Sequence, residues 1–389
     1  MLSKILLSFS IILISILLTG TPYSQPLIPR VDITDVNPNK GKVGDSVVIT
    51  GKGFGDERGT VLFGETEATV ISWSDVKIIV AISLGSSSGK LKIITPLTNG
   101  EHPFTIIPSW NLYPSPTNTF LKAIALRSPR DGWLIEKTGQ GNFFHFNGKL
   151  WEGVEKDVNC SCIGDICFLP SGEGWAVGGG GSIIYFNGKS WERVADALTR
   201  DDLNDVFFLS PTDGWAVGST GRIIHYFDWT VKDISWRKEN TLSVFDTLYA
   251  IHFISPEKGW AMGQNGTILE YHNKQWVSLT SPTGSVLYSM DFASENNGWA
   301  VGAFGTIIHY NGRAWVSYVS PVKENLNSIC MISDDNGWIV GDRGTILHYN
   351  GNDWIQGNSP SIINLHDIYF IAPDTGWAVG EEGVILYYH

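Results

Sequence analysis

Residues 289–318 read SMDFASENNGWAVGAFGTIIHYNGRAWVSY, and residues 328–357 read SICMISDDNGWIVGDRGTILHYNGNDWIQG. Both stretches contain a Gly-Trp pair and a second Trp farther along. The Gly-Trp pair recurs seven times in the chain, with its Trp at positions 133, 175, 215, 260, 299, 338 and 377. A spacing of about 40 residues that persists over seven copies is typical of a repeat architecture.

Each repeat contains four short apolar runs separated by turn residues. We call the four runs strands a, b, c and d in chain order. Gly-Trp opens strand b, a Gly-x-x-Gly turn leads into strand c, and Asn-Gly leads into strand d, which carries the second Trp. Asn-Gly favours a two-residue hairpin turn, because both positions tolerate positive φ. Four antiparallel strands in each repeat of about 40 residues predict the blade of a β-propeller.

The second Trp fixes the number of blades. It stands at positions 151, 191, 236, 276, 315 and 354, and the seventh repeat reaches His389 without one. Trp110 lies as far before Trp133 as the other second Trp residues lie before the next Gly-Trp. We therefore predict a seven-bladed β-propeller over residues 109–389, in which strand d of the last blade comes from residues 110–113 and pairs with residues 384–388.

Residues 28–107 lack the Gly-Trp pattern and form a separate module. They show alternating apolar residues between Gly, Asn, Asp and Ser turns, which is typical of an antiparallel sandwich. Asn37-Pro38, Val48-Ile49-Thr50-Gly51-Lys52-Gly53-Phe54-Gly55, Val61-Leu62-Phe63-Gly64 and Ile71-Ser72-Trp73-Ser74-Asp75 resemble an IPT/TIG domain. The resemblance implies an immunoglobulin-like fold that acts as a spacer or docking unit. The fold class expected for the whole chain is all-β.

The repeats themselves resemble the propellers of BNR/Asp-box proteins and of photosystem II stability/assembly factors. The shared residues are Gly-Trp-Ala-Val-Gly, as at 174–178 and 214–218, and the Gly-x-x-Trp turns. The Asp-box is degenerate, because Gly312 and Trp315 are present without the preceding Ser and Asp. Motifs of this kind identify a fold and leave the activity open.

The N-terminal residues predict export. Lys4 precedes the apolar stretch Ile5 to Leu18, which has the length of a secretory h-region and is too short for a comfortable membrane span. We expect a signal peptide over residues 1–24, a mature protein that is secreted or held in the cell envelope, and no membrane span after cleavage. A formal net charge of -12 argues against a nucleic-acid partner, since phosphate binding needs clustered Lys and Arg.

The cysteines leave alternatives open. Export permits disulfides, and Cys160 or Cys162 lies close enough in sequence to bridge to Cys167. The expected disulfide is Cys162–Cys167, with free thiols as the alternative. The C-x-C-x4-C cluster lacks the spacing of known zinc sites.

Candidate catalytic or metal residues recur in equivalent positions of different blades. Strand c carries His145, His225, His309 and His348. Equivalent positions in different blades lie apart around the ring of the propeller and cannot converge on one ion, so packing is favoured over a metal site. Asp165, Asp205 and Asp367 stand ten residues before their Trp, where they either line the channel or hydrogen-bond a neighbouring blade. No known catalytic motif occurs, so we expect no enzyme activity, no metal and no cofactor.

The variable positions are the better guide to function. The residue eleven before each Gly-Trp Trp differs between blades and follows an invariant Leu or Ile, which places it at the mouth of the central channel. The b–c turns, expected on the same face, add Phe304 and Arg343. The ligand-binding residues we predict are Lys122, Asn204, Tyr249, Tyr288, Asn327, His366, Phe304 and Arg343.

These observations favour an exported, non-catalytic binding or scaffold protein whose propeller face recognises a protein segment or a glycan. Two alternatives remain from the residues. One is a glycan hydrolase or lyase with acidic residues at the channel mouth, and the other is a purely structural surface protein. The resemblance to assembly factors implies a further one, an assembly or stability factor for an envelope complex.

Overall fold

The computed structural model describes residues 31–96, 98–137, 141–154, 163–194, 199–227, 235–239 and 244–389, with the backbone alone for 235–238. The chain divides into two compact units, Met1–Thr105 and Ile106–His389. The predicted signal peptide, Cys160 and Cys162 lie outside the described residues. No described helix combines the length and the hydrophobicity that a bilayer crossing needs.

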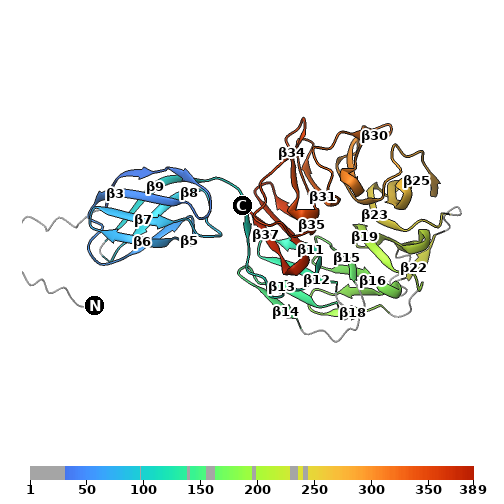
Figure 1. Cartoon of the computed structure of the whole chain (residues 1–389). Helices are drawn as coiled ribbons and strands as arrows, with labels where there is room; N and C mark the ends of the chain where they lie inside the picture. Colours follow the sequence, from blue (N-terminus) through green and yellow to red (C-terminus); the bar gives the residue numbers. More distant parts are fainter. Residues whose placement is uncertain are drawn as a thin grey trace, which may run out of the picture. The chain divides into compact units, whose positions relative to one another are not determined.

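The N-terminal unit is a two-sheet β-sandwich (Figure 1). One sheet has the order β1-β3-β7-β6 and the other β2-β9-β8-β4-β5. Their inward-facing residues, such as Val47, Ile49, Phe63 and Leu91, are fully buried, as the alternation in the sequence requires. The strands are β1 (Asp32–Asn37), β2 (Lys40–Gly41), β3 (Ser46–Lys52), β4 (Thr60–Phe63), β5 (Thr66–Glu67), β6 (Thr69–Ser74), β7 (Lys77–Ala81), β8 (Gly89–Ile94) and β9 (Asn99–Ile106).

The second unit contains seven four-stranded antiparallel sheets arranged in a ring (Figure 1). Blade 1 has β11 (Leu121–Ser128), β12 (Asp131–Glu136), β13 (Phe143–Phe146) and β14 (Trp151–Val154). Blade 2 has β15 (Ile163–Phe168), β16 (Gly174–Gly178), β17 (Ile183–Phe186) and β18 (Trp191–Arg193). Blade 3 has β19 (Leu203–Ser210), β20 (Asp213–Gly218), β21 (Ile223–Phe227) and β22 (Ser235–Lys238).

The remaining blades repeat this order. Blade 4 has β23 (Leu248–Ser255), β24 (Lys258–Gly263), β25 (Ile268–His272) and β26 (Gln275–Ser278). Blade 5 has β27 (Leu287–Ser294), β28 (Asn297–Gly302), β29 (Ile307–Tyr310) and β30 (Trp315–Tyr318). Blade 6 has β31 (Leu326–Ser333), β32 (Asn336–Gly341), β33 (Ile346–Tyr349) and β34 (Trp354–Gln356). Short 3-10 turns join the second and third strands in blades 2 to 7: η1 (Gly179–Gly181), η2 (Ser219–Gly221), η3 (Gln264–Gly266), η4 (Ala303–Gly305), η5 (Asp342–Gly344) and η6 (Glu381–Gly383).

The seventh blade closes the ring in the way that the spacing of Trp110 predicts. It contains β35 (Leu365–Ala372), β36 (Thr375–Gly380), β37 (Ile385–Tyr388) and, from the other end of the unit, β10 (Trp110–Leu112). In the antiparallel register, Trp110 lies opposite Tyr388 and Leu112 lies opposite Leu386. The closure prediction is confirmed, and the ring has no open edge between its first and last blades.

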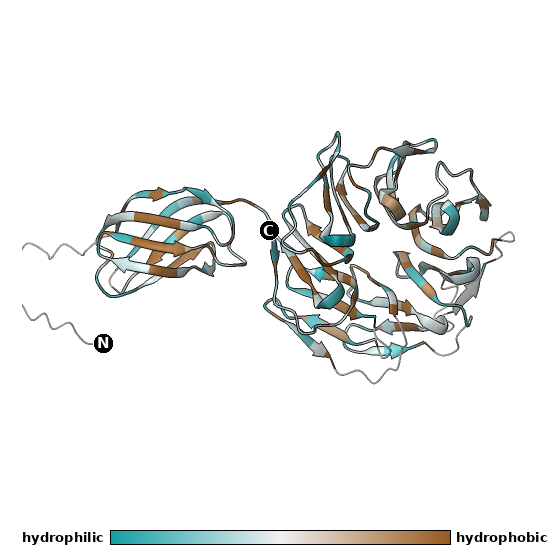
Figure 2. Ribbon diagram, in the orientation of Figure 1, coloured by the Kyte–Doolittle hydropathy of each residue, from teal (hydrophilic) through white to brown (hydrophobic). Residues whose placement is uncertain are grey.

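The Trp residues join each blade to the next. At the six interfaces where both side chains are described, the Gly-Trp Trp of one blade meets the second Trp of the following blade edge to face, as in Trp133–Trp191 at 5.6 Å and Trp377–Trp151 at 5.5 Å between ring centroids. Apolar residues run along the strands of both units, with hydrophilic residues at many turns (Figure 2). The ring Trp residues are therefore scaffold, as their regular repetition predicts.

Candidate functional site

Each inner strand of the ring begins with a β-bulge. The register shifts between the first residue and the third, as between Leu121 and Ala123 in blade 1 or Leu326 and Ser328 in blade 6. The extra residue is the variable one that stands eleven before the Trp. Bulges re-aim a side chain relative to the regular pleat. The seven bulge residues line one cavity of about 360 Å³, here called the mouth cavity: Lys122, Gly164, Asn204, Tyr249, Tyr288, Asn327 and His366.

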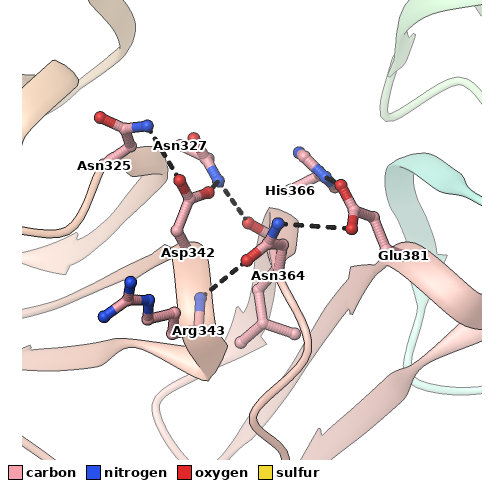
Figure 3. A network of polar contacts seen from close by, with 8 residues as sticks. Asn325, Asn327, Asp342, Arg343, Asn364, His366 and Glu381 are labelled. Carbon is pink, nitrogen blue, oxygen red and sulfur yellow. Dashed lines mark hydrogen bonds and ion pairs between the residues drawn. The ribbon is translucent and has the colours of Figure 1, made fainter.

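The b–c turns lie on the same face as the mouth cavity. In blade 6, Asn327 Nδ2 donates to Asp342 Oδ1 at 2.9 Å, and in blade 7, His366 Nε2 lies 3.3 Å from Glu381 Oε1 (Figure 3). In blade 4, Gln264 Nε2 donates to the Tyr249 hydroxyl at 3.5 Å. The first residue of each of these turns therefore contacts the mouth residue of its own blade.

Two predicted site residues lie on the rim rather than in the cavity. Phe304 and Arg343 occupy the middle of their turns with φ values of 58° and 56°, and both side chains are largely exposed. Their main-chain N–H groups donate to Asn325 Oδ1 and Asn364 Oδ1 of the following blade. Neither residue is among those that line the mouth cavity.

Lys137, Gly179 and Asp202 also line the mouth cavity, and the sequence pattern did not identify them. Lys137 and Gly179 each stand four residues after a Gly-Trp Trp, at the first position of the b–c turn. That position varies between blades as strongly as the mouth position does. Lys137 is identified when the residue four after the Trp of each Gly-Trp pair is compared between blades, in addition to the residue eleven before it.

Below the mouth, the three predicted aspartates line a cavity of about 250 Å³. Asp205 Oδ2 accepts from Ile251 N at 2.6 Å, Asp367 Oδ2 from Ile124 N at 2.8 Å, and Asp165 Oδ2 from Val206 N at 3.3 Å. Each donor belongs to the next blade. The aspartates thus line the channel and also hydrogen-bond the neighbouring blade, which was the structural interpretation of their pattern.

Burial governs the protonation of these carboxyl groups. It raises the pKa of Asp367 to about 6, and it raises the pKa of Asp165 well above its usual range, with the nearby Asp205 carboxyl acting in the same direction. Charged carboxylates are disfavoured where water is excluded. With their oxygens engaged by main-chain amides, these groups resemble structural links more than positioned acid–base catalysts.

Deeper in the channel lie the residues eight before each Trp. His252 Nδ1 lies 3.5 Å from Asp291 Oδ1, and burial lowers the pKa of His252 to about 4 and raises that of Asp291 to about 6. Among the described residues, neither Cys167 nor Cys330 forms a disulfide, and burial raises the pKa of the Cys167 thiol to about 12. Cys162 is not described, so the Cys162–Cys167 disulfide stays a prediction. The described residues contain no cluster of His, Cys, Asp and Glu suited to a metal ion.

The four strand-c histidines are packing residues, as predicted. Each imidazole pairs with the residue that starts strand b of its own blade, for example His225 Nε2 with Asp213 Oδ1 at 2.7 Å and His309 Nε2 with Asn297 Oδ1 at 2.9 Å. Each ring also lies against the Trp of its own blade, as His225 does against Trp215 at 3.7 Å. The four imidazoles belong to four different blades and form no common site.

Two family models match the chain. The IPT/TIG domain matches residues 32–109. The photosynthesis system II assembly factor YCF48 matches residues 105–227 and 271–358, which together are more than half of the chain.

Solved structures share the propeller fold. The structure of YCF48 bound to D1 peptide is 19% identical with a TM-score of 0.59, over 72% of this chain and 96% of that one. Virginiamycin B lyase from Staphylococcus aureus is 14% identical with a TM-score of 0.63, over 72% of this chain and 99% of that one. At such identities the likeness concerns the fold alone.

A curated relative matches over a short segment. Cyclomaltodextrin glucanotransferase from Bacillus sp. (strain 1-1) is 44% identical over 63 residues, which are 16% of this chain. This chain covers only 8% of that enzyme. A match of that length cannot include the ring of blades.

Proposed function

Since the chain belongs to the family of the photosynthesis system II assembly factor YCF48, we propose that it is an exported binding protein whose mouth cavity recognises a polypeptide segment without chemical turnover. A propeller of the same fold has been solved as YCF48 with a D1 peptide. By analogy, the ligand of this chain is a segment of a client protein, and the role is assembly or stabilisation of an envelope complex.

One observation carries the proposal. The seven mouth positions, which hold Lys, Gly, Asn, Tyr or His depending on the blade, converge on one cavity, while the frame of Gly-Trp strands around them is constant. They supply phenol, amide, imidazole and ammonium groups, which combine apolar bodies with hydrogen-bond donors and acceptors. A cavity of about 360 Å³ lies in the size range of small binding sites, enough for one or two side chains of a bound segment.

The absence of turnover in the proposal is supported by how the channel carboxylates are used. Asp205 and Asp367 are half-buried and accept main-chain N–H donors from the next blade. A glycan hydrolase needs a carboxylic acid and a second carboxylate free to act on the two sides of the scissile bond. Groups committed to holding the ring together are poorly suited to that task.

The export part of the proposal is supported by the N-terminal sequence. Lys4 and the apolar stretch to Leu18 have the order and length of a secretory signal. Fusing residues 1–30 to a reporter and assaying its translocation tests this part separately. A reporter that stays inside the cell would contradict export and leave the binding proposal standing.

Binding is tested with the chain from residue 25 onward on matched peptide and glycan arrays, followed by fluorescence anisotropy on the best ligands. We expect peptide binding, and we expect Tyr288→Ala to raise Kd by about tenfold or more, because truncating a buried aromatic contact typically costs at least about 2 kcal/mol. Leu150→Ala is the control, since Leu150 is exposed and lies in the c–d turn on the opposite face.

The same experiment separates the alternatives. Binding to glycans alone would replace the polypeptide ligand by a glycan. Mass spectrometry of the ligand after incubation detects turnover, and a product that disappears in Asp205→Asn or Asp367→Asn would make the chain an enzyme. No binding on either array would contradict a binding function.

A further inference from the structure

In three blades the mouth residue and the first residue of the b–c turn form a complementary pair. Asn327 donates to Asp342 and His366 lies against Glu381 (Figure 3). Gln264 donates to the Tyr249 hydroxyl. The pairing follows from the register, because the residue before each mouth residue lies opposite the last residue of strand b. Each pair satisfies its own polar groups.

Blade 1 has the same register with two like charges. Leu121 lies opposite Glu136, so the next two positions bring Lys122 and Lys137 to the same corner, and both line the mouth cavity. The Phe120 ring, against which Lys137 lies, stacks on the His366 ring at 4.2 Å between centroids, so the corner adjoins the mouth residue of blade 7. Two adjacent ammonium groups repel one another, where the other blades have an attractive pair.

In the described part of the chain, the carboxylates near this corner have other hydrogen-bond partners. Neither ammonium has an ion-pair partner there; Lys137 Nζ instead lies 4.8 Å from the centroid of the Phe120 ring. The neighbouring carboxylates are already engaged: Glu136 accepts from Thr117 Oγ1 and Asn142 Nδ2, and Asp367 accepts from Ile124 N and Ser328 Oγ. Two other carboxylates of this face also have partners, since Glu381 accepts from Asn364 Nδ2 and Asp202 from Gly180 N. The corner therefore presents to the mouth cavity two ammonium groups that have no ion-pair partner among the described residues.

We propose that the Lys122–Lys137 corner binds a carboxylate of the polypeptide ligand. The inference rests on the proposed function and specifies the chemistry that the mouth cavity selects. A carboxylate accepts from two ammonium donors at once and removes their mutual repulsion, and charge-assisted hydrogen bonds of this kind are stronger than neutral ones. The carboxylate comes from an Asp or Glu side chain or from the chain end of the ligand.

The test uses peptides that bind the wild-type chain, each remade in four forms. Asp and Glu are kept or changed to Asn and Gln, and the C-terminus is a free acid or an amide, so that the two sources are distinguished. Anisotropy titrations compare wild type with Lys122→Met, Lys137→Met and the double variant. Lys189→Met is the matched control, because Lys189 lies on a c–d turn at the opposite face. Thermal melts verify that each variant is folded.

We expect each corner substitution to raise Kd about tenfold, the effect of losing one hydrogen bond to a charged group, and Lys189→Met to leave it unchanged. Added salt should weaken wild-type binding and affect the double variant much less. One of the peptide forms lacks the recognised carboxylate. Its Kd for the wild-type chain should be at least as high as the Kd of the parent peptide for the double variant. Equal binding of all four forms, or no response to the Lys substitutions, would overturn the inference and leave peptide binding intact.

A second measurement needs no peptide. Lysines carrying ¹³C-methyl groups retain their charge, and the Lys122 and Lys137 signals are assigned by their loss in the two variants. Titration with N-acetylglutamate should shift both signals, and the uncharged N-acetylglutamine amide, which has no carboxylate, should not. Identical responses to the two compounds would contradict a carboxylate site. If only the carboxylate compound shifts the signals and no peptide binds, the carboxylate site stands and the proposed peptide-binding function is contradicted.

Discussion

His252 shows what burial does to one ionisable side chain of the channel. Its imidazole lies between the Phe207 ring, at 4.6 Å, and the Phe292 ring, at 5.1 Å. Burial lowers its pKa to about 4, and the same cause raises the pKa of the nearby Asp291 to about 6. Both shifts favour the uncharged form of the group, as expected where water is excluded.

Replacing His252 with Phe tests whether the pKa of this imidazole is lowered in the folded chain. The unfolded chain takes up the proton near pH 6.5 and the folded chain only near pH 4. The stability that the neutral His252 retains above pH 6.5 is therefore lost progressively as the pH falls toward 4, at about 1.4 kcal/mol for each pH unit. The free energy of unfolding of His252→Phe should rise relative to wild type between pH 7 and pH 4.5.

Urea unfolding of the two proteins at both pH values gives the comparison. The channel aspartates, whose raised pKa values act in the opposite sense, are present in both proteins and largely cancel in the difference, apart from Asp291, which contacts His252; the comparison is therefore made with Asp291→Asn in both proteins. A difference between variant and wild type that stays constant with pH would show that His252 titrates normally in the folded ring.

At the scale of the element, the glycine of each Gly-Trp pair lets strand b pack against its neighbour. A Cβ built on Gly298 would lie 2.3 Å from Cε1 of Phe292 in the adjacent strand a, and one built on Gly214 would lie 2.4 Å from Cε1 of Phe208. The Phe or its equivalent occupies the space that a side chain would need. The Gly of each Gly-Trp pair is therefore required by the close packing of strand a against strand b.

Gly298→Ala should therefore destabilise blade 5. Overpacking a well-filled site typically costs about 1–3 kcal/mol, and the Phe292 ring is held between Trp260 and Trp315, so it has little freedom to move. Gly284→Ala is the control, because a Cβ at this exposed position would have no neighbouring atom within 4 Å. Equal midpoints of denaturant unfolding for the two variants would contradict the packing role.

The strands and turns follow from local sequence, and parts of the site do not. Gly-Trp, Asn-Gly and period-two alternation locate the four strands of a blade, because each depends on neighbouring residues alone. The variable residue eleven before the Trp also follows from counting, which is how Asn204 and Tyr249 were found. The acceptor role of Asp205 was not recoverable in detail, since its donor, Ile251 N, belongs to another blade. Lys137 was missed for a similar reason, because its importance appears only beside Lys122.

At the scale of the whole molecule, ring closure depends on the two ends of the propeller unit. Strand β37 lies between β36 and β10, and Ser109 N donates to His389 O at 3.1 Å. Trp110 packs against Trp338 of blade 6 and against Phe370 of its own blade, at 5.6 and 5.7 Å between ring centroids. The last strand thus completes one blade and part of the apolar interface with the preceding one.

Deleting residues 383–389 should open the ring. The deletion removes the main-chain partner of Trp110 and several large apolar side chains, including the fully buried Ile385 and Leu386. Each such side chain contributes roughly 1.5–3 kcal/mol, so the melting transition of the propeller should fall by many degrees or disappear. The N-terminal unit has its own core and should keep its transition, which makes it an internal control in calorimetry. A truncated chain whose propeller melts at the wild-type temperature would show that β10 and β37 do not hold the ring closed.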